Sequence, residues 1–254
     1  MGGPVFTKPV RRIGCLAVAS VLVAGALIGS ARAQSTPETK PDLSGVWEVT
    51  MGVRTRPGPV APELPSLTPE YARKLADFKA AQAQGEDQET PQANCVPPGM
   101  PAIMNQPYPI ELLFTPGKVT IIIEAYSQTR RIFMDGRKHP DDPDLTYNGH
   151  SIGHWEGDTL VADSVGFTPD TALGPSQGYR HSDRMHIVER FRLSAPDTME
   201  VVTTIDDPKA LTRPFTSTKV LKRHRDWDIA EYICEQNNRN LATDKGKAGI
   251  ILNH

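Results

Sequence analysis

The chain has 254 residues, of which 28 are basic and 30 acidic, giving a formal net charge of −2. The first 33 residues contain four of the basic and none of the acidic residues, so the remainder carries a formal charge of −6. This balance argues against a nucleic-acid partner, which requires a basic face. After the N-terminal segment no apolar run approaches the roughly 20 residues of a membrane span, so we expect no anchor.

The N-terminus has the three parts of a secretory signal peptide. Lys8, Arg11 and Arg12 are basic, residues 13–28 are apolar, and Ala31-Arg32-Ala33 is a small-x-small cleavage site. We therefore expect cleavage after Ala33 and a periplasmic or secreted protein. The Arg11-Arg12 pair leaves the twin-arginine route open beside general export.

The mature part begins with short elements. Residues 34–44 are polar and are expected to be a flexible leader. The alternating segment 45–51 predicts a strand, and 54–67 is rich in proline. We expect a single β-rich domain over 45–240, followed by a C-terminal tail over 241–254.

One helix is predicted over residues 68–84. Thr68 is suited to the N-cap and Pro69 to the first helical position, while Gly85 ends the segment. The apolar residues of its buried face are Tyr71, Leu75 and Phe78.

From Pro109 onward the pattern is that of a mainly β protein. Short alternating runs are separated by turn residues such as Pro116-Gly117 and Gly157-Asp158. Such a series predicts an antiparallel barrel, lipocalin-like, or a strongly curved sheet. The predicted strands are 110–115, 118–125, 129–134, 152–155, 159–167, 184–193, 198–205, 217–223 and 227–234.

Two cysteines, Cys95 and Cys234, remain after signal cleavage. In an oxidising compartment we expect them to form a disulfide. The bridge would close a loop of about 140 residues, worth roughly 4–5 kcal/mol in the chain-entropy model. A reactive thiol is the alternative.

Two predicted strands carry one carboxylate each on an apolar face. In 184–193 this residue is Glu189, and in 227–234 it is Glu231. A carboxylate in a cavity can have a raised pKa and act as an acid or base. The alternative is a structural pair with an internal arginine, for example Arg131.

Residues 138–158 concentrate polar side chains, among them Tyr147, His150 and His154. Four residues of a strand span about 13 Å, so the two histidines would not share a metal. Since the segment also lacks an HxH or HExxH spacing, we expect no metal and no cofactor.

A second polar group precedes the strand of Glu189. His181 and Asp183 are two residues apart, and a carboxylate beside an imidazole orients the ring and favours its protonated form. This pairing suits a general acid or base and is also common in ordinary turns.

The segment Tyr147-Asn148-Gly149-His150-Ser151-Ile152-Gly153-His154-Trp155-Glu156-Gly157-Asp158-Thr159-Leu160-Val161 resembles the signature of a large family of exported bacterial proteins without an established activity. The segments 95–101, 131–140, 181–183, 206–210 and 231–235 also resemble that family. The resemblance implies an exported, β-rich single domain and adds no mechanism.

These residues support one main hypothesis, an exported small-molecule enzyme that works by proton transfer without a cofactor, of the lyase, dehydratase or isomerase type. His150 and His181 would be acid and base, Asp183 would orient His181, Glu189 would face the cavity, and Tyr147 would donate to an oxyanion. Arg131, His154 and Glu231 would bind the substrate.

Two rival hypotheses use the same residues differently. A non-catalytic, lipocalin-like carrier would use the internal carboxylates as ligand anchors or core pairs. An envelope interaction domain would dock a partner through the proline-rich segment 54–67. The sequence leaves the oligomeric state open.

Overall fold

The computed structural model describes residues 2–3, 40–49, 64–84, 88–89, 92–174, 178–237 and 249–250. Apart from residues 2 and 3, the predicted signal peptide and its cleavage site lie outside this part of the chain, as do Gly85, most of the proline-rich segment and most of the C-terminal tail. All the helices and strands in the described residues belong to the unit Thr39–His254. In chain order they are β1 (Gly45–Val49), α1 (Pro69–Ala83), β2 (Gln88–Glu89), η1 (Gln92–Asn94), η2 (Ala102–Asn105), β3 (Ile110–Thr115), β4 (Lys118–Ile123), η3 (Ala125–Ser127), β5 (Gln128–Phe133), β6 (His150–Glu156), β7 (Thr159–Val165), β8 (His186–Ala195), β9 (Thr198–Asp206), β10 (Phe215–His224), η4 (Glu235–Asn237) and β11 (Gly249–Ile250).

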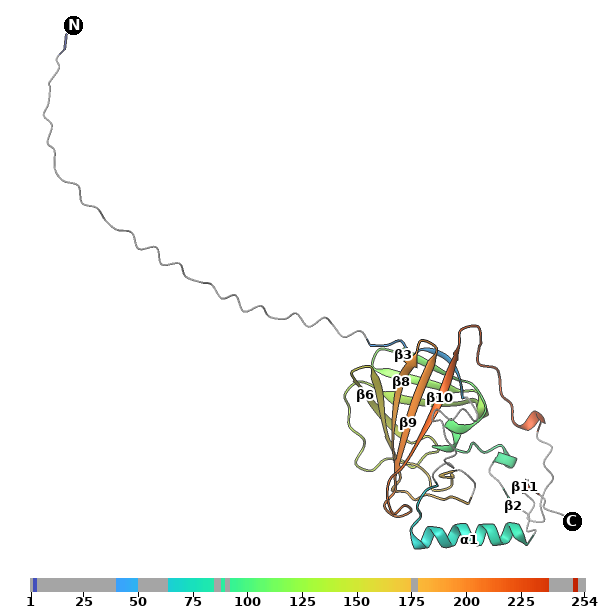
Figure 1. Ribbon diagram of the computed structural model, residues 1–254. Coiled ribbons are helices and arrows are strands. Elements are labelled where there is room, and N and C mark those ends of the chain that lie inside the picture. Colours follow the sequence, from blue (N-terminus) through green and yellow to red (C-terminus); the bar gives the residue numbers. More distant parts are fainter. Residues whose placement is uncertain are drawn as a thin grey trace, which may run out of the picture. The chain divides into compact units, whose positions relative to one another are not determined.

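The main sheet is a closed barrel with the strand order β1-β10-β9-β8-β7-β6-β5-β4-β3 (Figure 1). The predicted barrel is therefore confirmed. Neighbouring strands are antiparallel with one exception: β5 and β6 are parallel and share only two residue pairs, Ile132 with Ser151 and Phe133 with Ile152. Because parallel neighbours need a crossover, residues 134–149 return along the outer wall of the barrel.

The barrel interior follows from period-2 alternation along each strand. Residues that point inward are apolar at most positions and form one continuous core. Trp47, Ile121 and Phe191 are among its fully buried side chains. Burial of apolar surface at about 25 cal/mol per Å² is the main force that closes the barrel.

One barrel end is sealed by η2 and the turn before it. Met100 and Ile103 are buried, and the Met100 N–H donates to the Tyr147 carbonyl over 2.7 Å. Gly99 has a φ of +65°, and a Cβ there would lie 2.9 Å from the same carbonyl oxygen. The turn therefore requires glycine to bring η2 against the segment that precedes β6.

The opposite end is closed around Trp47. Its Nε1–H donates to the Leu43 carbonyl over 3.0 Å, and the Arg223 guanidinium lies 4.5 Å from the ring centre. Leu43 is fully buried. Residues 41–44 are thus anchored to the barrel, and the predicted flexible leader does not reach residue 44, because Leu43 supplies apolar surface to the core.

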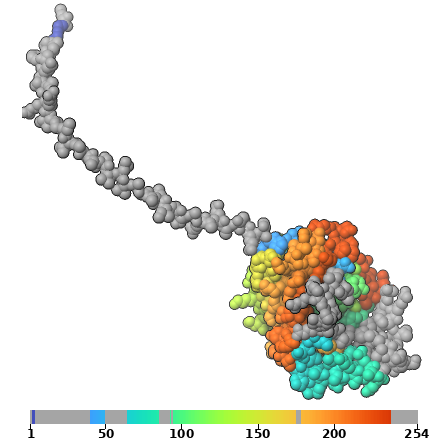
Figure 2. Space-filling view, in the orientation of Figure 1, coloured from blue at the N-terminus to red at the C-terminus, as the bar shows by residue number. Residues whose placement is uncertain are grey.

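Helix α1 matches the prediction closely. It begins after Thr68, has Pro69 at its first position and buries Tyr71. The Thr68 hydroxyl donates to the Lys209 carbonyl, in the loop between β9 and β10, and does not cap the helix. The rest of the helix is largely exposed, as its surface in Figure 2 shows.

The predicted strand over 227–234 is wrong. These residues form an irregular strap in which Glu231 is exposed, so this carboxylate does not face the interior. The reason is topological: β10 already pairs with β1 and closes the barrel, so its wall has no free edge for another strand. The strap is held by two hydrogen bonds, from Ser127 Oγ to the Tyr232 carbonyl and from the Ala230 N–H to Glu124.

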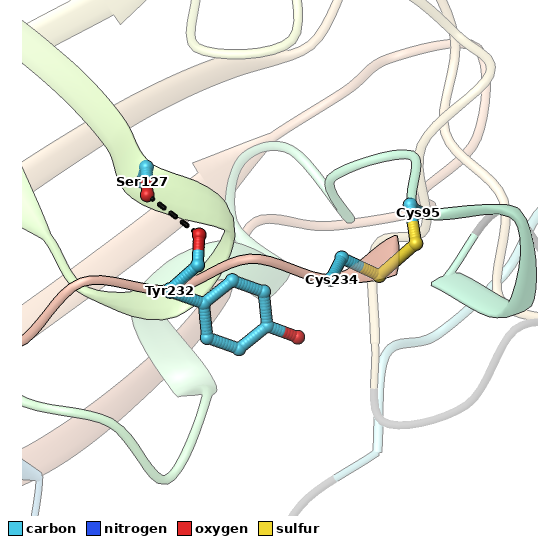
Figure 3. The surroundings of a disulfide bond; sticks show 4 residues. All are labelled: Cys95, Ser127, Tyr232 and Cys234. Carbon is cyan, nitrogen blue, oxygen red and sulfur yellow. Dashed lines mark hydrogen bonds between the residues drawn. A yellow bond between two sulfur atoms is a disulfide. The ribbon is translucent and has the colours of Figure 1, made fainter. Parts of the chain in front are cut away.

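The predicted disulfide is confirmed. Cys95 and Cys234 are bonded, with their Cα atoms 5.5 Å apart, and the bridge fixes the strap to the segment before η2 (Figure 3). The two residues are 139 positions apart. A cross-link over such a long loop reduces the entropy of the unfolded chain. We therefore expect the bridge to contribute to stability and not to chemistry.

We expect replacement of both cysteines by alanine to lower the free energy of unfolding by about 2–5 kcal/mol, measured by urea denaturation of the mature protein. The barrel should persist, because no core residue is removed. Unchanged stability, or two titratable thiols in the unreduced wild type, would contradict the bridge.

Candidate functional site

The predicted internal carboxylate, Glu189, lies inside the barrel and is paired. Its Oε2 is 2.5 Å from Nη1 of Arg130 on β5, both side chains are at most 2% exposed, and neither atom has another partner. The pair crosses the interior from β8 to β5. The alternative that Glu189 pairs with an internal arginine is therefore confirmed. The partner is Arg130, whereas Arg131, the example suggested by the sequence, points outward.

The remaining guanidinium nitrogens of Arg130 bind two serines. Nε donates to Ser151 Oγ over 3.2 Å and Nη2 to Ser164 Oγ over 2.9 Å, and the two hydroxyls lie 2.7 Å apart. Buried charges are tolerated when they are paired and hydrogen-bonded in this way. The network joins β5, β6, β7 and β8, and it leaves Glu189 without a free proton-transfer role.

A further cation lies on the inner face of β10. Lys219 donates to the Met104 carbonyl over 3.2 Å, at the end sealed by η2. Burial lowers the pKa of Lys219 to about 8, opposed by the negative charge of Glu189. Lys219 is not among the site residues predicted from the sequence.

His150 is on the outer face of the barrel, in a chain of polar rings. Its Nδ1 is 2.8 Å from Nδ1 of His139, and Nε2 of His139 is 3.1 Å from Asp163, which also accepts a 2.7 Å hydrogen bond from His186. Since His139 donates to Asp163, a neutral His139 accepts from His150. Burial lowers the pKa of His150, and the Asp163 hydrogen bond raises that of His186.

His181 and Asp183 do not form the predicted pair. His181 is buried, with Nε2 2.6 Å from Thr171 Oγ1 and Nδ1 donating to the Ser182 carbonyl. Asp183 is turned outward and binds Lys209. The turn between them separates residues that alternation alone would place on one face.

The carboxylate that organises this turn is Asp207, which the sequence analysis missed. It is fully buried and accepts hydrogen bonds from the N–H and the hydroxyl of Ser182 and from the N–H of Lys209. It therefore ties the segment before β8 to the loop after β9. Its sequence signal was weak, because Asp206-Asp207-Pro208 is also typical of an exposed turn.

An open recess of about 520 Å³ lies where β5 and β6 part. We call it the β5–β6 recess. Its wall consists of residues 128–131 of β5, residues 146–151 leading into β6, and Phe133, Pro140, Pro143 and Asp144. It thus brings together three of the predicted site residues, Arg131, Tyr147 and His150.

Asn148, a residue of the recess wall, has a buried acceptor without a donor. Asn148 Nδ2 donates to Gln128 Oε1 over 3.2 Å, and Gln128 Nε2 donates to the Tyr126 carbonyl over 3.1 Å. The second bond fixes the orientation of the Gln128 amide and hence that of Asn148. The Asn148 Oδ1 atom is then buried with no hydrogen-bond partner, a state that costs about 1–3 kcal/mol.

The other predicted residues lie elsewhere. His181 and His150 are at the same end of the barrel, before β8 and at the start of β6, but only His150 lines the recess. Asp183 lines a separate recess beside Tyr71 and Lys209. His154 is exposed on the outer face and pairs with Glu156. The predicted convergence of His150, His181, Asp183 and Glu189 is therefore wrong.

Among the described residues no three His, Cys, Asp or Glu side chains are arranged to hold a metal ion. No helix in the same part of the chain has both the length and the apolar character to cross a bilayer.

The chain has a distant structural likeness to a solved protein. No family model matches the chain, and no curated protein matches it. A solved structure of a secretary abundant heat soluble (SAHS) protein from Ramazzottius varieornatus aligns with 74% of this chain and 98% of its own, at 11% identity and a TM-score of 0.34.

We expect Glu189→Gln to lower the free energy of unfolding by about 3–5 kcal/mol, because it leaves the Arg130 charge buried without a counterion. Urea denaturation measures the change. Glu156→Gln is the control, since Glu156 pairs with Arg190 on the exposed face, where solvent screens the pair, and its replacement should be far less destabilising. Equal, small effects would show that Glu189 is not a structural partner.

Burial lowers the pKa of His181 below 6.5. The unfolded chain therefore takes up a proton that the folded protein does not, and His181 makes the protein less stable as the pH falls through about 6.5. We expect the stability difference between wild type and His181→Gln to shrink from about pH 7.5 to about pH 5. A stability profile of His181→Gln that runs parallel to that of the wild type over this pH range would contradict the assignment.

Proposed function

We propose that the protein is an exported carrier that binds a small molecule in the β5–β6 recess without chemical conversion. The observation that carries the proposal is the recess itself, about 520 Å³ in volume and lined by polar side chains that include Arg131, Asn148 and His150, a volume within the usual range for ligand sites. The disulfide is compatible with export, since such bonds persist in oxidising compartments.

The distribution of titratable groups supports binding over catalysis. Glu189 is neutralised by Arg130, His181 is enclosed by its own hydrogen bonds, and Asp183 is engaged by Lys209. An acid–base enzyme requires two such groups within hydrogen-bond reach of one substrate atom. Of the catalytic residues in the enzyme hypothesis, only Tyr147 and His150 line the recess.

Acid–base catalysis by His150 is the second candidate function. It rests on the hydrogen bond from His150 to His139, which is backed by Asp163 in the manner of an oriented base. His150→Asn discriminates between the two: it would abolish turnover by an enzyme, with a loss of about 10²- to 10⁴-fold, and would leave a carrier able to bind.

A substitution that fills the recess tests the carrier proposal. Thr129 is an exposed residue of β5 that lines the recess, and Thr218 is an exposed residue of β10 that is outside its lining. The test is a panel of metabolites, each added to the wild type and to both variants. A metabolite that raises the melting temperature of the wild type should not raise that of Thr129→Trp but should still raise that of Thr218→Trp. Equal stabilisation of both variants would place the ligand elsewhere.

A further inference from the structure

One edge of β5 has no strand partner over its first residues. On one side β5 pairs with β4 along its whole length, from Gln128 to Phe133, whereas on the other side it pairs with β6 only at Ile132 and Phe133. Among the described residues no backbone hydrogen bond joins residues 128–130 to a segment other than β4. The peptide groups of this stretch that point away from β4 therefore form an open sheet edge, which is a template for a further strand.

A bend before β6 leaves this edge open. The Thr146 N–H donates to the Gly166 carbonyl over 3.0 Å, and Thr146 is bridged to Phe167, just after β7. Gly149 has a φ of +66°, and a Cβ there would lie 2.6 Å from the Phe167 ring. The chain that enters β6 is therefore held on the side of β7, and the β5–β6 recess separates it from residues 128–130.

The side chains that cross this gap do so on its inner side. Gln128 and Arg130 lie on the same face of β5 as Ile132, which is fully buried. From this face Gln128 accepts a hydrogen bond from Asn148, and Arg130 donates to Ser151. These bonds form the floor of the recess and leave its outer side, next to the backbone of β5, open to solvent.

A strand added to this edge would have a defined length. It would lie in line with β6 and would have to stop where β6 begins, at His150. At about 3.3 Å per residue, the edge over 128–130 is roughly 10 Å long, which corresponds to about three residues of an extended peptide. Main-chain hydrogen bonds supply the affinity when a peptide extends a sheet in this way.

Arg131 lies at the end where such a strand would stop. The register of Ile132 with Ser151 places Arg131 next to His150. Arg131 is exposed, lines the recess and forms no ion pair within the described part of the chain, so its guanidinium is suited to a terminal carboxylate. Because Asp144 also lines the recess, a free peptide with a charge of each sign is favoured over a simple anion.

We propose that the β5–β6 recess binds a free tripeptide, which adds a short strand along residues 128–130 and places its terminal carboxylate on Arg131. The inference rests on the proposed function and names its ligand class. The peptide runs parallel to β5, because its carboxyl end lies at Arg131, the C-terminal end of the open edge. The fold thus determines the length and the direction of the ligand.

Titration calorimetry at pH 7 with trialanine, Ala-Val-Ala, Ala-Thr-Ala and Ala-Tyr-Ala tests the proposal. At least one tripeptide should bind with a Kd of about 1 mM or tighter, and its C-terminal amide should bind about tenfold more weakly, because it lacks the carboxylate charge. Failure of every tripeptide to bind at this level overturns the inference. Binding confined to a decapeptide that ends in the same three residues also overturns it, since the occupant would then be the tail of a protein.

N-methylation of the peptide tests the strand pairing. Successive peptide groups of an extended strand point in opposite directions, so only one of the two peptide N–H groups of a tripeptide faces β5. Methylation of that nitrogen should weaken binding about threefold to tenfold, the effect of one lost hydrogen bond, and methylation of the other less than about twofold. If neither methylation weakens binding, the ligand does not extend the sheet and the proposal is wrong.

Arg131→Gln locates the carboxylate. This variant should bind the free tripeptide about tenfold more weakly than the wild type and the tripeptide amide within about twofold of it. Arg192→Gln is the control, because it removes an exposed arginine from the outer face of β8, and it should change the affinity for neither peptide. Equal effects of Arg131→Gln on the two peptides would show that the carboxylate is bound elsewhere.

Amide exchange measured by NMR distinguishes the tripeptide from a second copy of the chain as the occupant. Saturating tripeptide should slow the exchange of at least one amide among residues 128–130 about tenfold and leave the amides of β10 unchanged. Unchanged exchange along β5 would contradict the site. A dimer in which the amides of residues 128–130 are protected without peptide would assign the edge to a second copy.

The proposed function and this inference fail differently. If no tripeptide binds while a non-peptide metabolite stabilises the wild type but not Thr129→Trp, the carrier proposal stands and the ligand class is wrong. If tripeptides bind with equal affinity to the wild type and to Thr129→Trp, the site itself is elsewhere and both fail.

Discussion

The buried pair of Arg130 and Glu189 is the interaction on which the rest of the barrel depends. Backbone pairing between β5 and β6 is limited to two residue pairs, the shortest contact in the closed sheet. Arg130 compensates from the inside, because it connects β5 to Ser151 on β6, Ser164 on β7 and Glu189 on β8. Side-chain hydrogen bonds thus hold the barrel closed where the backbone ladder is interrupted.

The same interruption creates the candidate site. Because the pairing of β5 with β6 begins only at Ile132 and Ser151, residues 128–130 extend beyond the start of β6. The crossover 134–149 lies outside the barrel. The described interior is occupied by apolar side chains and by the Arg130 network. Binding is therefore proposed at the wall, where polar side chains converge, and the interior serves as the structural support of that wall.

Much of the fold could be predicted from the sequence, because alternation, turn residues and cysteine count are local signals. They identified nearly all the barrel strands, the helix, the disulfide and the inward direction of Glu189. The parallel pairing of β5 with β6 could not be predicted, because side chains alternate with the same two-residue period in parallel and antiparallel strands. In the site, Arg130 and Arg131 are adjacent, so a shift of one position exchanges the inner and outer faces. His181 and Asp183 were misplaced because a turn does not preserve strand alternation.

A double-mutant cycle tests the central claim, that Arg130 and Glu189 form a structural pair and not catalytic machinery. When both charges are replaced together, in Arg130→Met with Glu189→Leu, no buried charge is left unpaired, so the protein should recover to within about 1–2 kcal/mol of the wild-type stability. Each single replacement should be far more destabilising than the pair. Losses that simply add in the double variant would contradict the account, since they would show that the two residues stabilise the barrel independently.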